Sequence, residues 1–333
     1  MAGSFPYEGG KPMATVMEIR RSHSRQRAKR RVDWIAYGYL SPALVTICVL
    51  SILPIFYTIY ISFTNFNQMH FLSYQFIGLK NYEELLNPHD PLSNLFLPTF
   101  IWTLVYALCT TVLAYLVGLF LAVLLNNKHM KERTLYRTLL IVPWAVPNLI
   151  SMLAWQGLLN DQYGQINALL HGVFGLPPIP WLTSALWARV AVIMVNVWAG
   201  FPYMMIVCLG ALQSIPTDQY EAAEIDGANW WQVFRYVTMP SVWRISLPLL
   251  IPSFSFNFNN FNASYLLTGG GPPNSNNPFL GETDILATAA YKMTLTFNRY
   301  DLGATISVLL FILVALISWV QMRYTGAFKE VDA

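Results

Sequence analysis

The amino-acid sequence predicts an all-α fold: a polytopic membrane protein with about six transmembrane helices. Apolar residues make up 55% of the 333-residue chain and charged residues only 11%, whereas soluble domains carry about 25% charged residues. Several charge-free stretches reach the roughly 20 residues that a helix needs to cross a bilayer. Aromatic residues reach 15%, which suits the tryptophan and tyrosine belts of membrane interfaces. These observations argue against an ordinary soluble domain.

Six stretches fit membrane spans. The first five contain proline or glycine at interior or boundary positions, where buried neighbours can satisfy the freed backbone groups. The first stretch follows a basic tail but is too long for the apolar core of a cleavable signal peptide, so we expect it to remain as a signal-anchor. In chain order, the predicted spans are roughly 35–63, 98–125, 138–160, 187–213, 243–267 and 302–322.

Lysine and arginine predict the orientation of these spans. Eight of them lie before residue 32, four in the 126–137 loop, two beside the Glu-Ala-Ala segment of the loop 214–240, and two after the last span. If both termini are cytoplasmic, 16 of the 20 cationic residues face inward, as the positive-inside rule requires. The four that remain outside are Lys80, Arg189, Lys292 and Arg299.

The polar loop 214–240 predicts a short helix, a tight bend and a second helix. Pro216 suits a first helical turn, because its missing N–H has no helical partner there. Gly227 permits a sharp exit that a residue with a Cβ resists, and we expect the second helix to end before Pro240. From the residues alone, this element is either an ordinary amphipathic loop helix or a handle for another protein.

The pattern of this loop resembles the signature loop of ATP-binding-cassette (ABC) import permeases. It reads E-A-A-x-x-D-G-A from Glu221 to Ala228, followed by Phe234 and the pair Met239-Pro240. The resemblance implies a helix that docks into a cleft on a cytoplasmic ATPase, on the side that the charge distribution predicts. The implied coupling residues are Glu221, Ala222, Ala223, Asp226, Gly227 and Pro240.

The fifth predicted span carries unusual polar chemistry, because amides inside a membrane are costly unless they find partners. Polar residues recur there at i, i+4, i+7 and i+11, which is one face of a continuous helix: Ser253, Asn257, Asn260 and Ser264. Amides and hydroxyls interleaved with aromatic rings suit a sugar, whose hydroxyl groups both donate and accept hydrogen bonds. The alternative is that these side chains bond one membrane helix to another.

This span and the segment 265–272 after it resemble the MalF-type permeases of maltose/maltodextrin importers, over about residues 98–325. The resemblance implies sugar contacts from the third, fourth and fifth spans. In the fourth span the implied contacts lie between Asn196 and Tyr203, and this segment could instead be a Gly/Pro hinge packed against a neighbouring helix. In the third span the implied contacts are Trp144 and Asn148, where that family has a tyrosine and a serine, so this chain differs at both positions. The implied substrate-binding residues are Asn196, Ala199, Gly200, Tyr203, Ser253, Phe256, Asn257, Asn260, Trp144 and Asn148.

The resemblance also implies the fold and the domain plan. The fold would be the MetI-like type I ABC importer permease fold. The plan is a basic cytoplasmic tail (1–33), the first transmembrane helix with a short external loop (34–97), a permease core (98–325) that contains the coupling loop 214–240, and a cytoplasmic tail (326–333). Some members of the family carry a large folded external domain, and here the corresponding loop is only 64–97.

The predicted function is that of the permease subunit of an ATP-driven maltose/maltodextrin importer in the cytoplasmic (inner) membrane of a prokaryote. Its implied partners are a second homologous permease, two ABC ATPase subunits, an external sugar-binding protein and the lipid bilayer, with no nucleic acid. The chain has no G-x-x-x-x-G-K-[S/T] motif and no metal-ligand spacing. We therefore expect no catalytic or metal site and no cofactor on this chain, with ATP and Mg on the partner ATPases.

Two other functions stay open. An ABC permease for another oligosaccharide or for glycerol phosphate would share the fold, although an anionic cargo favours Arg or Lys in its site, and the predicted faces contain neither. A stand-alone secondary transporter is the alternative of a different class. Proton-coupled carriers usually place carboxylates within the membrane, whereas the 17 Asp and Glu residues lie outside or at the ends of the predicted spans.

Overall fold

The computed structural model describes residues 37–89, 92–127 and 130–325, so both predicted tails, 1–33 and 326–333, lie outside the described residues. The chain forms two compact units, Met1–Tyr57 and Thr58–Ala333. The first unit is helical from Tyr37 onward and includes the π-helical turn η1 (Cys48–Ile52). The helix continues through α2 (Leu53–Ser62), which gives a candidate span close to the predicted 35–63.

A pair of long helices, α4 (Ser93–Leu125) and α8 (Ala185–Gln213), forms the centre of the second unit. Buried residues recur every three or four positions along α4, and its remaining face is apolar and exposed, as expected of a helix between protein and lipid. The two helices approach closely at Gly118, where a Cβ would lie 2.6 Å from the backbone nitrogen of Met205. Small residues allow such close crossings of membrane helices.

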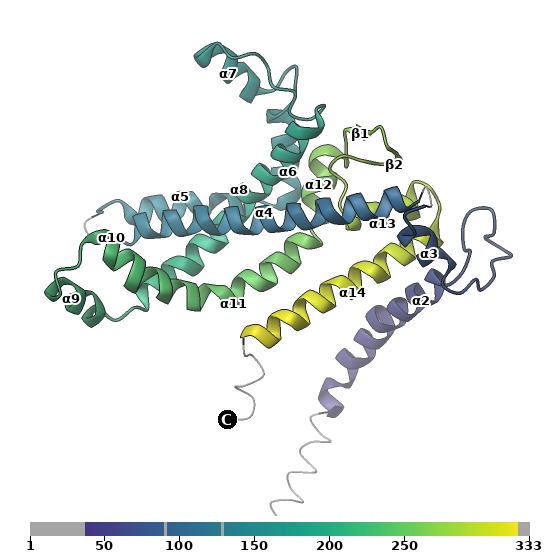
Figure 1. The fold of residues 1–333 in the computed structure, drawn as a ribbon, viewed down its shortest axis with the longest axis horizontal. Helices are drawn as coiled ribbons and strands as arrows, with labels where there is room; N and C mark the ends of the chain where they lie inside the picture. Colours follow the sequence, from purple (N-terminus) through teal and green to yellow (C-terminus); the bar gives the residue numbers. More distant parts are fainter. Residues whose placement is uncertain (1–36, 90–91, 128–129, 326–333) are drawn as a thin grey trace, which may run out of the picture. The chain divides into compact units, whose positions relative to one another are not determined.

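The third predicted span, 138–160, is bent rather than straight. It consists of α5 (Arg133–Ala145) and α6 (Asn148–Leu158), whose axes differ by 93°. Pro147 accounts for the break, because the residue before a proline is driven to extended backbone, and Val146 has φ −80° and ψ 134°. In Figure 1, α6 leaves the direction of α5, and Gln156 on α6 donates to the Leu267 carbonyl at 3.2 Å.

The fifth predicted span, 243–267, is broken as well. α11 (Met239–Phe258) is followed by the non-helical Asn259 and Asn260, and α12 (Phe261–Thr268) begins after them. The prediction of one continuous polar face is therefore wrong at its far end. Ser264 belongs to α12, and its buried hydroxyl donates to the Thr283 carbonyl.

Among the described residues, four helices are long and apolar enough to cross a membrane, or up to five if α5 and α6 make one span. The all-α polytopic fold is confirmed, and the count of six is not. The helices α4, α8 and α14 (Tyr300–Thr325) cover the second, fourth and sixth predicted spans. α11 is 20 residues long, but its serines, prolines and asparagine lower its hydropathy below that of a typical span.

The four cations predicted to lie outside occur on segments at one end of the second unit. That end holds α3 (Lys80–Leu86), α13 (Leu286–Leu295) and a hairpin of β1 (Pro273–Asn274) and β2 (Asn277–Gly281). The helices α9 (Thr217–Ile225) and α10 (Trp230–Val233) lie at the other end (Figure 1). Each cation pairs with a carboxylate: Lys80 with Glu84, Arg189 with Glu282, Lys292 with Asp284 and Arg299 with Asp301. The loop between α6 and α8 also contains the unpredicted helix α7 (Gln165–Phe174).

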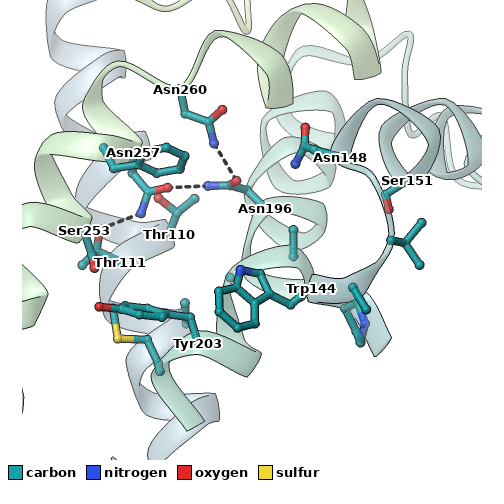
Figure 2. A pocket seen from close by; sticks show the side chains of 18 of the residues that line it. Thr110, Thr111, Trp144, Asn148, Ser151, Asn196, Tyr203, Ser253, Asn257 and Asn260 are labelled. Atoms are coloured by element: carbon teal, nitrogen blue, oxygen red, sulfur yellow. Dashed lines mark hydrogen bonds between the residues drawn. The ribbon is translucent and has the colours of Figure 1, made fainter. Parts of the chain in front are cut away.

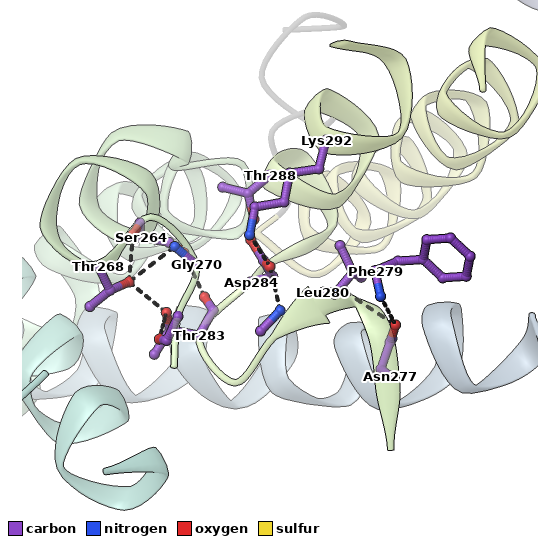
Figure 3. Close-up of polar contacts among 12 residues, drawn as sticks. Ser264, Thr268, Gly270, Asn277, Phe279, Leu280, Thr283, Asp284, Thr288 and Lys292 are labelled. Atoms are coloured by element: carbon purple, nitrogen blue, oxygen red, sulfur yellow. Dashed lines mark hydrogen bonds and ion pairs between the residues drawn. The ribbon is translucent and has the colours of Figure 1, made fainter. Parts of the chain in front are cut away.

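A buried carboxylate holds the hairpin end together. Asp284 accepts hydrogen bonds from the Gly281 N–H at 2.7 Å and from the Thr288 hydroxyl at 2.8 Å, and it pairs with Lys292 Nζ at 2.6 Å (Figure 3). Its side chain is fully buried. One charged group thus ties β2 to α13 through three bonds.

The loop 214–240 forms the predicted helix and bend but not the predicted ending. α9 (Thr217–Ile225) follows Pro216, and Gly227 turns the chain with φ +75°. α10 (Trp230–Val233) then runs through the π-helical turn η2 (Phe234–Thr238) into α11, so the second helix does not end before Pro240. The wider π turn directly before the proline accommodates a ring that would clash in a regular helix.

Candidate functional site

One cavity of about 630 Å³ opens between α4, α8, α11 and the bend that joins α5 to α6. All ten residues predicted to bind substrate line it, from Trp144 and Asn148 at the bend to Asn260 after α11 (Figure 2). The predictions came from three separate spans, and the fold brings these spans to a single site. Ser264 does not line the cavity.

A chain of side-chain hydrogen bonds crosses one wall of the cavity. Asn260 donates to Asn196 at 2.9 Å, Asn196 donates to Asn257 at 2.9 Å, and Asn257 donates to Thr111 at 3.0 Å (Figure 2). These bonds join α8 to α11, to the segment after α11 and to α4. Hydrogen bonding between helices, one of the two roles considered for these amides, therefore occurs, and the same side chains still face the cavity.

Aromatic rings and a glycine shape the remaining surface. Trp144 and Tyr203 lie with ring centroids 6.2 Å apart and planes inclined by 49°, and Phe256 is 71% exposed. Gly200 lies opposite Ala114, and a Cβ placed on it would be 3.7 Å from the Ala114 Cβ. Flat apolar surfaces beside amide groups can cover the C–H faces of a pyranose while its hydroxyls bond to the amides.

Sequence reasoning missed several lining residues, chiefly Thr110, Thr111 and Ser151. The threonines form a polar pair in the middle of α4, and that pair was the available signal. Ser151 is a single hydroxyl in an apolar helix and gave none. Among the described residues that line the cavity there is no Asp, Glu, Lys, Arg or His, so the site is polar without formal charge.

The predicted coupling residues gather around a second, smaller hollow. Ala222, Ala223, Asp226 and Pro240 line a groove of about 410 Å³ between α9 and the start of α11. Glu221 is exposed on α9 outside this groove, and Gly227 forms the bend. Tyr220 holds α9 to the helix bundle, since its hydroxyl lies 3.4 Å from that of Thr238.

Comparison with known proteins defines the class of this chain. It belongs to the family of binding-protein-dependent transport system inner membrane components, whose model matches residues 114–324. The chain is therefore a membrane-embedded permease of an ABC importer with the MetI-like type I fold, and it is a transporter subunit rather than an enzyme.

Two curated sugar-transport permeases are similar to this chain in sequence. The galactooligosaccharide transport permease GanP of Bacillus subtilis is 39% identical over 296 residues, which cover 88% of this chain and 71% of GanP. The maltose/maltodextrin permease MalF of Vibrio parahaemolyticus is 41% identical over 259 residues, 76% of this chain and 49% of MalF. This chain thus spans about half the length of that MalF relative.

A solved structure supports the fold. The crystal structure of a bacterial ABC transporter for the acidic polysaccharide alginate superposes with a TM-score of 0.74 at 22% identity, covering 91% of this chain and 99% of that chain. At this identity the match supports the helical architecture alone.

Proposed function

We propose that this chain is the membrane-spanning permease subunit of an ATP-driven importer for maltose and maltodextrins, and that the cavity of Figure 2 is the sugar's binding site. The observation that carries the proposal is the convergence of the ten predicted contacts on one uncharged cavity. Ligand pockets are typically 300–1,000 Å³, and the volume of about 630 Å³ lies within that range.

The chemistry of the lining favours a neutral cargo. Burying an ionised cargo without a counter-charge costs several kcal/mol even after relaxation, and the described lining offers no such charge. Sugar hydroxyls need only hydrogen-bond exchange, which amides and serine hydroxyls supply. We therefore place glycerol phosphate and amino acids outside the substrate range.

The partners follow from the same proposal. A second homologous permease would cover the side of the cavity where Trp144 and Phe256 are 57% and 71% exposed. Two ATPase subunits, which carry ATP and Mg, would dock at the coupling residues Glu221, Ala222, Ala223, Asp226, Gly227 and Pro240. An external sugar-binding protein would deliver cargo at the end that holds the hairpin. Both termini would be cytoplasmic, in the inner membrane of a prokaryote.

A galactooligosaccharide is the second candidate cargo, favoured by the relative GanP at 39% identity. It is also a neutral polymer of hexoses, so an uncharged cavity suits it equally. The choice between the two depends on the stereochemistry of individual hydroxyl groups.

Reconstitution tests both candidates directly. The chain is assembled with its partner subunits in proteoliposomes, and uptake is measured for radiolabelled maltose, maltotriose, galactobiose, glycerol phosphate and an amino acid. We expect uptake of the glucans and exclusion of the two charged cargoes. Uptake of glycerol phosphate with the sugars ignored would overturn the proposal, whereas preference for galactobiose would select the second candidate.

A further inference from the structure

Ser151, a residue that lines the cavity, has a hydroxyl that no described residue uses. The residue lies on α6, one turn after Asn148, and it is among the residues that line the cavity (Figure 2). It is 4% exposed, and its Oγ makes no hydrogen bond with any described residue. Buried hydroxyls in proteins normally have a partner, so this one calls for an explanation.

Five other buried or half-buried helix hydroxyls are occupied by their own helix. Each donates to the carbonyl four residues earlier, at distances of 2.6–2.8 Å: Thr103, Thr110, Ser246, Ser253 and Thr305. The corresponding carbonyl for Ser151 is that of Pro147, which accepts the Ser151 backbone N–H at 3.1 Å. The Ser151 side chain does not join it. Its hydroxyl is therefore not used by the local back-bond that serine often makes in a helix.

On the opposite wall of the cavity, the amide side chains are already hydrogen bonded within the protein. Asn196 uses both ends of its amide, one for Asn257 and one for Asn260, and Asn257 also bonds Thr111. Much of the hydrogen-bonding capacity of that wall is thus spent within the protein. The α6 wall, with Ser151 and the exposed Asn148 on one face, keeps more of its capacity for a ligand.

We propose that Ser151 determines specificity in this cavity by hydrogen bonding to one hydroxyl of the transported saccharide. A serine hydroxyl has one donor and two acceptor positions, so it can serve a sugar hydroxyl that donates or accepts. The Oγ is itself inaccessible to solvent, so the contact requires the short side chain to move to another staggered position about χ1, which would turn the oxygen toward the sugar. The inference rests on the proposed function, since it assumes a neutral saccharide as cargo.

Uptake kinetics of the reconstituted complex test this role. Ser151→Ala is compared with Ser255→Ala, a matched control whose Oγ is also buried and unpartnered among the described residues but does not line the cavity. We expect Ser151→Ala to raise KM for maltose about 2- to 12-fold, the range for one lost neutral hydrogen bond. Ser255→Ala should leave KM unchanged, and complex yield should be equal for both variants.

Deoxy-maltoses, each lacking one hydroxyl, separate recognition from structure. Removal of the sugar hydroxyl that Ser151 contacts should raise KM in the wild type. The same removal should have no further effect in Ser151→Ala, because that bond is already lost. Equal deoxy-sugar penalties in both proteins for every hydroxyl would overturn the inference. Should Ser151→Ala fail to assemble, Ser151→Cys keeps the shape of the side chain, with a larger sulfur atom and a weaker hydrogen bond, and enters the same comparison. Absence of maltose uptake by the wild type would instead overturn the proposed function.

Discussion

Asn196 donates a hydrogen bond to Asn257 over 2.9 Å, although the two residues lie 61 positions apart on α8 and α11. The same asparagine accepts a bond from Asn260, so it joins two segments of the cavity wall to α8. Because these side chains also face the cavity, the packing of the helices and the surface offered to cargo depend on the same atoms. A shift of α8 against α11 would change both.

Asn196→Leu should therefore destabilise the assembled complex more than Asn260→Leu. The first change breaks two bonds, leaving the buried Asn260 amide without its acceptor and the half-buried Asn257 carbonyl without its donor, at a cost of about 1–3 kcal/mol. The second change breaks one bond, at about 0.5–1.5 kcal/mol. Thermal unfolding of the purified complex in nanodiscs ranks the two variants against the wild type. Equal melting temperatures for both would show that Asn196 is not the centre of the network.

Gly118 and Gly200 form a second matched pair. A Cβ on Gly118 would lie 2.6 Å from a backbone atom of α8, whereas one on Gly200 would make an ordinary contact of 3.7 Å. We expect Gly118→Ala to lose about 1–3 kcal/mol through overpacking and to lower the yield of complex. Gly200→Ala should assemble normally and reduce uptake, because its methyl group enters the cavity. The reverse pattern of yields would contradict this assignment.

Replacing Gly227 should disturb coupling and leave sugar affinity unchanged. Its φ of +75° is unfavourable for a β-branched side chain, so Gly227→Val should uncouple uptake from ATP hydrolysis or detach the ATPase. Gly227→Asn should retain most activity, since asparagine tolerates this conformation. Gly210→Ala, at a helical glycine in open space, serves as the control. Wild-type stimulated ATPase activity and uptake in Gly227→Val would refute the prediction.

Lys292→Met should be strongly destabilising. It leaves the fully buried carboxylate of Asp284 without its cation, and breaking a buried pair from one side costs about 3–5 kcal/mol. The double variant Asp284→Asn with Lys292→Met should recover part of this loss, since no charge is then buried alone. Apparent melting temperatures of the two proteins provide the comparison. If the double variant were as unstable as the single one, the loss of stability would come from lost packing rather than from the unpaired charge.

The sequence was sufficient for the residue types of the cavity but not for the continuity of its helices. Spacing placed Ser253 and Asn257 on one face because α11 is helical at both positions. The same spacing failed at Ser264, because the chain leaves the helix at Asn259 and Asn260, where the Asn260 amide bonds to Asn196 in the cavity wall. Periodicity assumes an unbroken helix and cannot reveal where tertiary contacts interrupt it.

The bend at Pro147 had a local signal that the span prediction did not use. Pro143 and Pro147 are four residues apart, and the restriction on the residue before a proline favours a boundary there. Ser151 had no such signal, since an isolated serine in an apolar helix forms no pattern. Its importance emerges only when α6 turns toward α8 and α12. The ten site residues themselves remain predictions until uptake is measured.

The 93° turn between α5 and α6 also sets an order of events in biosynthesis. The Leu267 carbonyl to which Gln156 on α6 donates lies 111 residues later in the chain. At a translation rate of about 5–20 residues per second, Gln156 is made roughly 6–22 s before that partner exists. During this interval α6 lacks the hydrogen-bond partner that it has in the complete structure. The α6 side of the cavity is thus completed only after α12 has been made.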